Sequence, residues 1–420
     1  MIGIIKIKIN FISMWGIDKK KVLAVNSGSS SFKYKLFSLD NEEVIASGMA
    51  DRVGLPGSVF TMTLADGSQH DEQSDIANQE EAVQKLLSWL KEYNVIDSLE
   101  DIAGVGHRVV AGGEEFTDST VITEDNLWKI YNMSDYAPLH NPAEADGIYA
   151  FMKVLPNVPE VAVFDTSFHQ SLDPVQYLYS VPYKYYEKFR ARKYGAHGTS
   201  ARYVSRRTAD LLNKPVEDLK MVLCHLGSGA SVTAIKDGKS FDTSMGFSPV
   251  AGITMSTRSG DVDPSLLQFI MKKGNITSFN EVIKMLNTES GLLGLSGISP
   301  DMRDIEKAIK NGDKQAQLTK DIFINRIVRY IGAYMTEMGG LDVLVFTAGI
   351  GEHDASVRKQ IMDGLTWLGL EYDEEANKAN HEGVITTPNS KITAMIVPTN
   401  EELMIARDVV RLAKLDKLNK

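Results

Sequence analysis

Two similar stretches, KVLAVNSGSSSFKYKLFSLD from Lys21 and MVLCHLGSGASVTAIKDGKS from Met221, occur in the two halves of the chain. Each contains an apolar strand, a turn of small polar residues and a second strand in which apolar and polar residues alternate. The turn residues Gly28-Ser29 correspond to Ser228-Gly229. This correspondence predicts a duplicated unit, although two unrelated hairpins would share the same common pattern.

Outside these two stretches, strand-like and helix-like segments alternate. The runs AGVGHRVV from Ala103, VAVFD from Val161 and DVLVFT from Asp342 are typical of strands. Apolar residues at helical spacing predict helices around Glu80–Leu90 and Leu318–Met338, the second ending at Gly339-Gly340. This order indicates an α/β fold, and 420 residues exceed what one hydrophobic core usually supports, so we expect two domains.

The bulk properties exclude several classes of partner. A net charge of −10 and a pI near 5.4 argue against a nucleic-acid or anionic-membrane binder, because both partners need a basic surface. No apolar run reaches the roughly 18 residues of a membrane-spanning helix. The single cysteine, Cys224, cannot form an internal disulfide, which favours a reducing, cytoplasmic location. The apolar stretch 1–20 is interpreted as an extra leader or a mis-called start, with Met14 as the alternative beginning.

Three turns of small residues after apolar strands are candidates for binding phosphate. They are NSGSSS at 26–31, LGSGA at 226–230 and GIG at 349–351. Turns rich in Gly and Ser expose backbone N–H groups that bind phosphate, but none of the three matches the phosphate loop ending in GK[ST] or the GxGxxG pattern. A hairpin turn explains each one alone, whereas three together favour a nucleotide held between two lobes.

Arg108 lies inside the apolar segment GHRVVAGG, and strand alternation places it on the same face as Val110. Because an isolated charge there is costly, Arg108 needs an anionic partner. That partner is either an internal carboxylate or a ligand whose carboxylate or phosphoryl group binds the guanidinium while its alkyl group meets Val110.

Three more side chains complete a set that is typical of phosphoryl transfer. Asp165 ends an apolar strand, where it would hold Mg²⁺, orient a nucleophile or cap the next segment. His197 lies in a turn of small residues within the basic stretch 182–207, and it is either structural or a donor to a phosphoryl oxygen. Arg258 lies in a polar turn, where it would neutralise charge on the transferring group, and a metal ion is expected as well.

Ten ordered segments from about Lys21 almost to the C-terminus resemble the acetate kinase family. They are VNSGSSSFKYKLF, GHRVVAGGEEFT, APLHNP, VAVFDTSFHQ, YGAHGTSARYV, HLGSGAS, DTSMGFSPVAGITMSTRSGDVDP, SGLLGLSGISPDMRDI, VFTAGIGEH and PTNEELMIARD. The resemblance implies two duplicated RNase-H-like lobes of the actin and Hsp70 type, with the nucleotide cleft between them. It divides the chain into an extension 1–20, an N-terminal lobe 21–164 with helix 399–420 packing back on it, and a nucleotide-binding and dimerisation lobe 165–398.

The same resemblance implies a role for individual residues. Asp165, His197 and Arg258 would be catalytic, and Asn26 and Glu401 would bind the metal ion. The carboxylate substrate would contact Arg108, Val110, Leu139, Ala196 and Pro249. The nucleotide would contact Lys33, His225, Leu226, Gly227, Ser228, Gly229, Asp301, Met302, Arg303, Gly349, Ile350, Gly351, Glu352 and His353.

Several positions depart from the family pattern without removing a proposed catalytic side chain. They are Ala111, Ala196, Ala201, Ser228, Ser256 and His353, where the family usually has His, Phe, His, Asn, Gly and Asn. Ala196 leaves space beside the acyl pocket unless a neighbouring side chain fills it. Since each buried CH₂ contributes roughly 0.8 kcal/mol, we expect propionate to be accepted more readily than in a tight acetate pocket.

The expected reaction is a reversible, Mg²⁺-dependent, in-line transfer from ATP to acetate that gives acetyl phosphate and ADP, with Mn²⁺ as an alternative ion. A carboxylate needs no deprotonation at pH 7, so Asp165 is expected to serve the metal or substrate orientation rather than act as an essential base. The enzyme is expected to be a cytoplasmic homodimer. A propionate- or butyrate-preferring kinase and a non-catalytic nucleotide-binding protein of the same fold are the alternatives.

Overall fold

The computed structural model describes residues 20–415 apart from 29 and 139. The alternative start at Met14 and the candidate Leu139 therefore lie outside the described residues. The chain divides into two compact units, of which unit 1 holds 20–109, 119–163 and 402–415, and unit 2 holds 110–118 and 164–401. Segment 110–118, which the sequence places with the N-terminal lobe, belongs to unit 2, where the Gly112 N–H donates to Thr166 Oγ1 at 3.1 Å.

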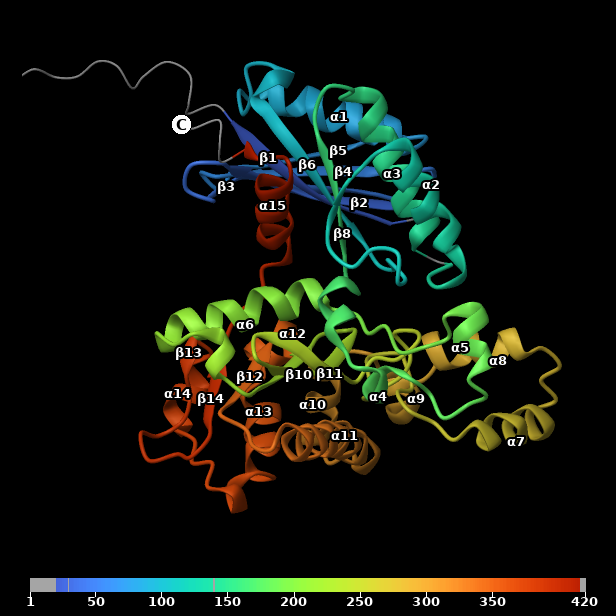
Figure 1. Ribbon diagram of the computed structural model, residues 1–420, viewed down its shortest axis with the longest axis vertical. Coiled ribbons are helices and arrows are strands. Elements are labelled where there is room, and N and C mark those ends of the chain that lie inside the picture. The colour runs from blue at the N-terminus through green and yellow to red at the C-terminus, as the bar shows by residue number, and fades with distance from the viewer. Residues whose placement is uncertain (1–19, 29, 139, 416–420) are drawn as a thin grey trace, which may run out of the picture. The chain divides into compact units, whose positions relative to one another are not determined.

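Unit 1 is built on an eight-stranded sheet with the order β5-β4-β3-β2-β1-β6-β8-β7 (Figure 1). Strand β1 is antiparallel to β2 and parallel to β6. The strands are β1 (Lys21–Ser27), β2 (Ser31–Ser38), β3 (Val44–Asp51), β4 (Val59–Leu64), β5 (Gln69–Gln73), β6 (Ile102–Val109), β7 (Thr120–Val121) and β8 (Glu160–Phe164).

Helices cover both faces of this sheet. They are α1 (Gln79–Glu92), α2 (Glu124–Asn132), α3 (Asn141–Val154) and α15 (Glu401–Leu412), with 3₁₀ turns at Leu99–Asp101 and Met133–Asp135. The predicted stripe of α1 is buried against one face, in a cluster shared with α3. On the other face α15 approaches β6 so closely that a Cβ at Gly104 or Gly106 would collide with Val409 or Ile405, which explains why both positions are glycine.

Unit 2 contains a six-stranded sheet with the order β11-β10-β9-β12-β14-β13. Its strands are β9 (Met221–Leu226), β10 (Ala230–Lys236), β11 (Lys239–Thr243), β12 (Val343–Thr347), β13 (Gly383–Val384) and β14 (Thr393–Ile396). In both sheets three antiparallel strands form a meander, and a parallel strand extends it beside the first of them. The shared topology confirms the predicted duplicated α/β fold.

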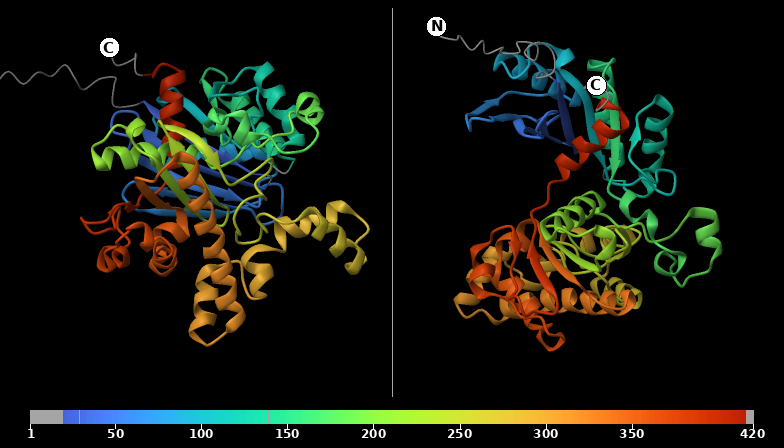
Figure 2. Two further views of the ribbon diagram at one scale, coloured as in Figure 1. Left: turned by 60° about the horizontal axis from the view of Figure 1, so that its bottom comes forward. Right: turned by 60° about the vertical axis from the view of Figure 1, so that its left-hand side comes forward.

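The unit 2 sheet lies between α6 and α11, as Figures 1 and 2 show. Its helices are α4 (Pro174–Tyr177), α5 (Lys184–Phe189), α6 (Gly198–Leu212), α7 (Pro264–Gly274), α8 (Phe279–Thr288), α9 (Gly291–Ser296), α10 (Met302–Lys310), α11 (Lys314–Met338), α12 (Ala348–His353), α13 (Ala355–Asp363) and α14 (Glu374–Ala379), with 3₁₀ turns η3 (Ser167–Ser171), η4 (Val216–Asp218) and η5 (Thr366–Leu368).

The residues of β9 alternate between the two cores of unit 2. Met221 and Leu223 pack with α6, whereas Val222 and Cys224 belong to the core on the α11 side. Helix α11 ends at Gly339 in a left-handed conformation, as the sequence predicts. The predicted stripe is confirmed at Ile327, Ile331, Tyr334 and Met338, which are buried, and is wrong at Leu318, which is 49% exposed.

Candidate active site

In unit 1 three candidate residues form a row across adjacent strands. Asn26 of β1 is the Cα partner of Lys33 in β2, and the parallel register of β1 with β6 pairs Val25 with His107. The next positions along these two strands are Asn26 and Arg108, so Lys33, Asn26 and Arg108 lie side by side. Alternation puts them on the face that α15 covers, where Lys35 pairs with Glu402 of that helix at 3.1 Å. The row offers an amide oxygen between two cationic side chains.

In unit 2 His197 stands at the start of α6 and faces the turn after β9. Its backbone is left-handed, with φ 58°, and its Nδ1 lies 2.9 Å from Ser231 Oγ. A Cβ placed on Gly229 would lie 3.4 Å from both His197 Nε2 and Arg258 Nη1. The imidazole and the guanidinium therefore point at the same glycine of the predicted phosphate turn 226–230.

His225 packs directly against His197. The two rings stack with centroids 4.1 Å apart and planes inclined by 24°. Nδ1 of His225 is 2.9 Å from Ser200 Oγ, which in turn is 2.8 Å from Thr399 Oγ1. Ser200 and Thr399 thus join the site, although no sequence pattern singles them out.

Glu352 links the third predicted turn to the segment before Glu401. Its Oε1 accepts the backbone N–H of Ala348 at 2.8 Å and that of Thr399 at 3.2 Å. Residues 349–351 lie inside the short helix α12 rather than in an open turn, which corrects the sequence interpretation. The bond from the Ala348 N–H to the Glu352 side chain closes the first turn of that helix.

Asp165 directly follows β8 and is 2% exposed. Its backbone carbonyl accepts the N–H of Gly198 at 2.8 Å, so it anchors the start of α6 through the main chain. The residues at the N-caps of η3 and α6 are Thr166 and His197, so the alternative of Asp165 as an N-cap is wrong.

The loop that carries Arg258 is folded back on itself. The N–H of Met255 donates to the Arg258 carbonyl at 3.1 Å, and Nη1 of Arg258 lies 3.9 Å from Met255 Sδ. Gly291, with φ 62°, packs so closely on this loop that a side chain there would collide with the backbone of Met255 and Arg258. This packing holds the guanidinium beside Gly229.

The predicted nucleoside residues sit at the start of α10. Asp301 caps the helix by accepting the Arg303 N–H at 2.9 Å, and the Arg303 guanidinium holds the pKa of that carboxyl at about 2. Met302 is buried. The exposed Arg303 side chain therefore has a fixed carboxylate partner at neutral pH.

Among the residues predicted to surround the acyl group, Val110, Ala196 and Pro249 belong to unit 2. Val110 and Ala196 are buried, with 7% and 5% of their surface exposed. Ala196 belongs to the same buried cluster as Met245, Ile253 and Met255. Ala196 is therefore part of the apolar core of unit 2.

The basic stretch 182–207 contains both exposed and buried side chains. Helix α5 has no buried residue among its six, as expected of a charged helix face. Arg192, by contrast, is 4% exposed and binds Glu114 Oε1 at 2.9 Å. The described part of the chain contains no helix that is long and apolar enough to cross a membrane.

Comparison with known proteins matches residues 21–407 to the acetokinase family. The acetate kinase of Enterococcus faecalis is 56% identical over 395 residues, covering 93% of this chain and 99% of that protein. The crystal structure of the Porphyromonas gingivalis acetate kinase superposes with a TM-score of 0.90 at 42% identity, covering 94% and 99% of the two chains. A propionate kinase from Francisella tularensis gives 0.87 at 39% identity, covering 94% and 100%.

These matches, together with the fold, place the chain among the ATP-dependent carboxylate kinases, a class of phosphotransferases. It belongs to the acetokinase family. The resemblance inferred from ten sequence segments is thereby confirmed.

Proposed function

We propose that the chain transfers the γ-phosphoryl group of ATP to acetate, in a reversible reaction that yields ADP and acetyl phosphate. The observation that carries the proposal is the approach of His197 Nε2 and Arg258 Nη1 to Gly229 in a turn of small residues. An imidazole and a guanidinium directed at one phosphate-type turn suit a transition state whose negative charge spreads over three phosphoryl oxygens.

In this proposal the predicted site residues have separate roles. Arg108 binds the carboxylate of acetate, and its oxygen attacks phosphorus in line with the leaving ADP. His197 and Arg258 stabilise the equatorial oxygens during the transfer. Asp165 orients the reactants, and His225 with the turn 226–229 contacts phosphate oxygens. The nucleoside of ATP contacts residues 301–303 and 349–353.

Asn26 and Glu401 would hold the divalent ion, which we propose to be Mg²⁺. An amide oxygen and a carboxylate are the hard donors that this ion prefers, and Mg²⁺ is commonly bound by one or two protein oxygens together with substrate phosphates. When bound, the ion neutralises phosphate charge. Lys33, the strand partner of Asn26, adds a cation to the same row.

We further propose a cytoplasmic homodimer. Helices α7 and α8 leave large apolar side chains exposed on unit 2, namely Leu266, Phe269, Phe279 and Ile283, with 45%, 57%, 55% and 41% of their surface accessible. A second copy of this chain would cover such a face. We therefore expect the molecular mass in solution to be twice that of one chain.

The assay that tests the proposal measures ADP formation from ATP with acetate, propionate or butyrate, with hydroxylamine trapping of the acyl phosphate. We expect the highest kcat/KM with acetate, and no ADP formation without a carboxylate. ATP binding without carboxylate-dependent ADP formation would show a non-catalytic nucleotide-binding protein instead.

Ala196 is expected to influence the length of the acyl chain that is accepted. In Ala196→Phe the ratio of propionate to acetate kcat/KM should fall by about fourfold, the equivalent of one buried CH₂. The measurement is the kcat/KM of each substrate. Ala196→Val serves as a smaller step, because a Phe that does not fit would lower both rates together. An unchanged ratio in active variants would mean that a neighbouring side chain already fills the space.

A further inference from the structure

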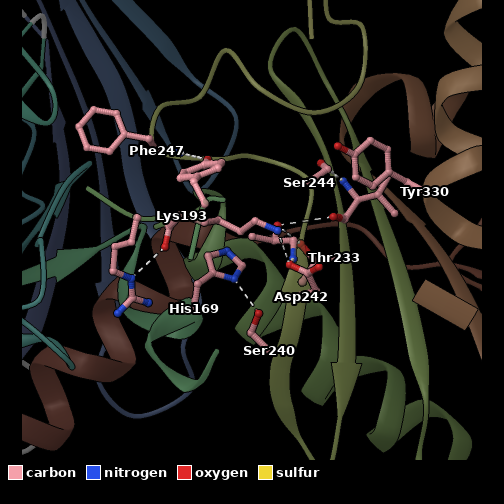
Figure 3. Close-up of polar contacts among 12 residues, drawn as sticks. His169, Lys193, Thr233, Ser240, Asp242, Ser244, Phe247 and Tyr330 are labelled. Atoms are coloured by element: carbon pink, nitrogen blue, oxygen red, sulfur yellow. Dashed lines mark hydrogen bonds and ion pairs between the residues drawn. The ribbon is translucent and has the colours of Figure 1, made fainter. Parts of the chain in front are cut away.

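The segment that leads into His197 is anchored at almost every residue. Lys193 binds Asp242 Oδ1 through Nζ at 2.6 Å, which Figure 3 shows next to the His169 ring. Three further contacts hold the segment. Arg192 binds Glu114, the N–H groups of Tyr194 and Gly195 donate to the Gly246 carbonyl, and the Gly198 N–H donates to the Asp165 carbonyl. Such dense anchoring is what a left-handed backbone at a non-glycine residue such as His197 requires.

His169 supplies the anchor at Ala196. The residue lies in η3 and is fully buried. Its Nε2 is 2.9 Å from the Ala196 carbonyl oxygen, and its Nδ1 is 2.7 Å from Ser240 Oγ. Because a carbonyl only accepts, Nε2 carries the proton and donates, and Nδ1 accepts from the Ser240 hydroxyl. Burial lowers the pKa of His169 to about 4, so the neutral ring and this tautomer persist at neutral pH.

The carbonyl that His169 binds controls the orientation of His197. The Ala196 C=O and the His197 N–H belong to one rigid peptide plane, so fixing the oxygen fixes ψ of Ala196 and φ of His197 together. The ring also blocks movement of the preceding residue. A Cβ at Gly195, where φ is 75°, would lie 2.7 Å from His169 Cδ2 and 2.6 Å from Thr243 Cγ2.

We propose that His169 is a positioning residue for phosphoryl transfer. By donating its Nε2–H to the Ala196 carbonyl, it orients the imidazole of His197 toward Gly229 and sets the place of the Ala196 methyl group. His169 acts only through this peptide and does not itself meet the reactants. The inference rests on the proposed function, since it assigns a role in that reaction.

Two substitutions at His169 separate the hydrogen bond to the Ala196 carbonyl from the hydrogen bond to Ser240. The amide nitrogen of Gln reaches the place of Nε2, whereas the shorter Asn reaches only the place of Nδ1. In His169→Asn we expect kcat with acetate to fall by about ten- to a hundredfold, because small displacements of reacting groups cost rates of this order. ADP affinity, measured by isothermal titration calorimetry, should stay within about twofold. His169→Gln should recover kcat to within about fivefold of the wild type.

Ser240→Ala is the matched control for loss of stability. It removes the hydrogen bond at Nδ1 and leaves the bond to Ala196, so it should lower the melting temperature while kcat stays within about threefold of the wild type. His381 is an exposed histidine of unit 2. His381→Asn controls for the change from His to Asn itself, and it should change neither kcat nor the melting temperature.

The outcomes distinguish the inference from the proposed function. A wild-type protein without carboxylate-dependent ADP formation contradicts the function. An active wild type with full kcat in His169→Asn contradicts the positioning role alone. The positioning role is also contradicted if Gln, Asn and Ser240→Ala lose activity in proportion to their melting temperatures, because that result would mean a purely structural histidine.

Discussion

Arg258→Ala is expected to lower kcat for carboxylate-dependent ADP formation by about 10³-fold, the usual cost of removing a guanidinium that stabilises charge on a transferring phosphoryl group. The side chain lies beside Gly229 and opposite His197, so it would act on the phosphoryl oxygens rather than on the adenosine end. ADP affinity and the melting temperature should change little. Steady-state kinetics, calorimetry and thermal unfolding on one preparation provide the three measurements.

Two variants control this experiment. Arg258→Lys keeps the charge but loses the planar fork, so it should recover only part of kcat. Arg329→Ala removes an exposed arginine from α11 of the same unit and should leave the kinetics unchanged. A kcat within tenfold of the wild type in Arg258→Ala would exclude the proposed role.

The largest effect on stability is expected at Arg358. This side chain is fully buried in unit 2, and its guanidinium donates to four oxygens, namely Asn377 Oδ1, Asn377 O, Asn380 Oδ1 and Gly351 O, at 2.8, 2.5, 2.6 and 2.9 Å. Burial lowers its pKa to about 10, so it remains a cation at neutral pH. Arg358→Ala would leave a cavity and unpaired acceptors, and should reduce the free energy of unfolding of unit 2 by about 3 kcal/mol or more.

Thermal unfolding of Arg358→Ala tests this expectation. ADP affinity should fall as well, because the bond from Arg358 to the Gly351 carbonyl holds helix α12, which contains the predicted nucleoside residues 349–353. Arg358→Met fills most of the volume without donors and should be nearly as destabilised as the alanine variant. A loss of 1 kcal/mol would lower the melting temperature by more than about 2 °C. If both variants melt within about 2 °C of the wild type, water satisfies the four acceptors and the expectation is wrong.

The sequence predicts the architecture well where one periodicity dominates. The hairpins at Lys21 and Met221, and the helix that contains Val83 and Leu90, are specified by local alternation and helical spacing, and all of them form. Alternation together with strand pairing also accounts for the row of Lys33, Asn26 and Arg108.

The parts that could not be predicted depend on contacts between distant segments. Ser200 Oγ lies 2.8 Å from Thr399 Oγ1 although the two residues are far apart in the sequence, and no local pattern predicts such a contact. Leu318 lies on the exposed side of α11 because the neighbours of the helix, not its own spacing, decide which flank is buried. Residues 349–351 form part of a helix, in which the Glu352 side chain accepts a hydrogen bond from the Ala348 N–H.

The inward-facing thiol of β9 has a practical consequence. Cys224 is the only cysteine of the chain and is fully buried, and burial raises the pKa of its thiol far above the usual range, so it should resist alkylating dyes in the folded protein. Trp128 in unit 1 and Trp367 in unit 2 are 66% and 80% exposed. A Trp128→Cys, Trp367→Cys double variant would therefore accept a donor and an acceptor fluorophore without a cysteine-free background, and energy transfer between them would report any change in their separation during turnover.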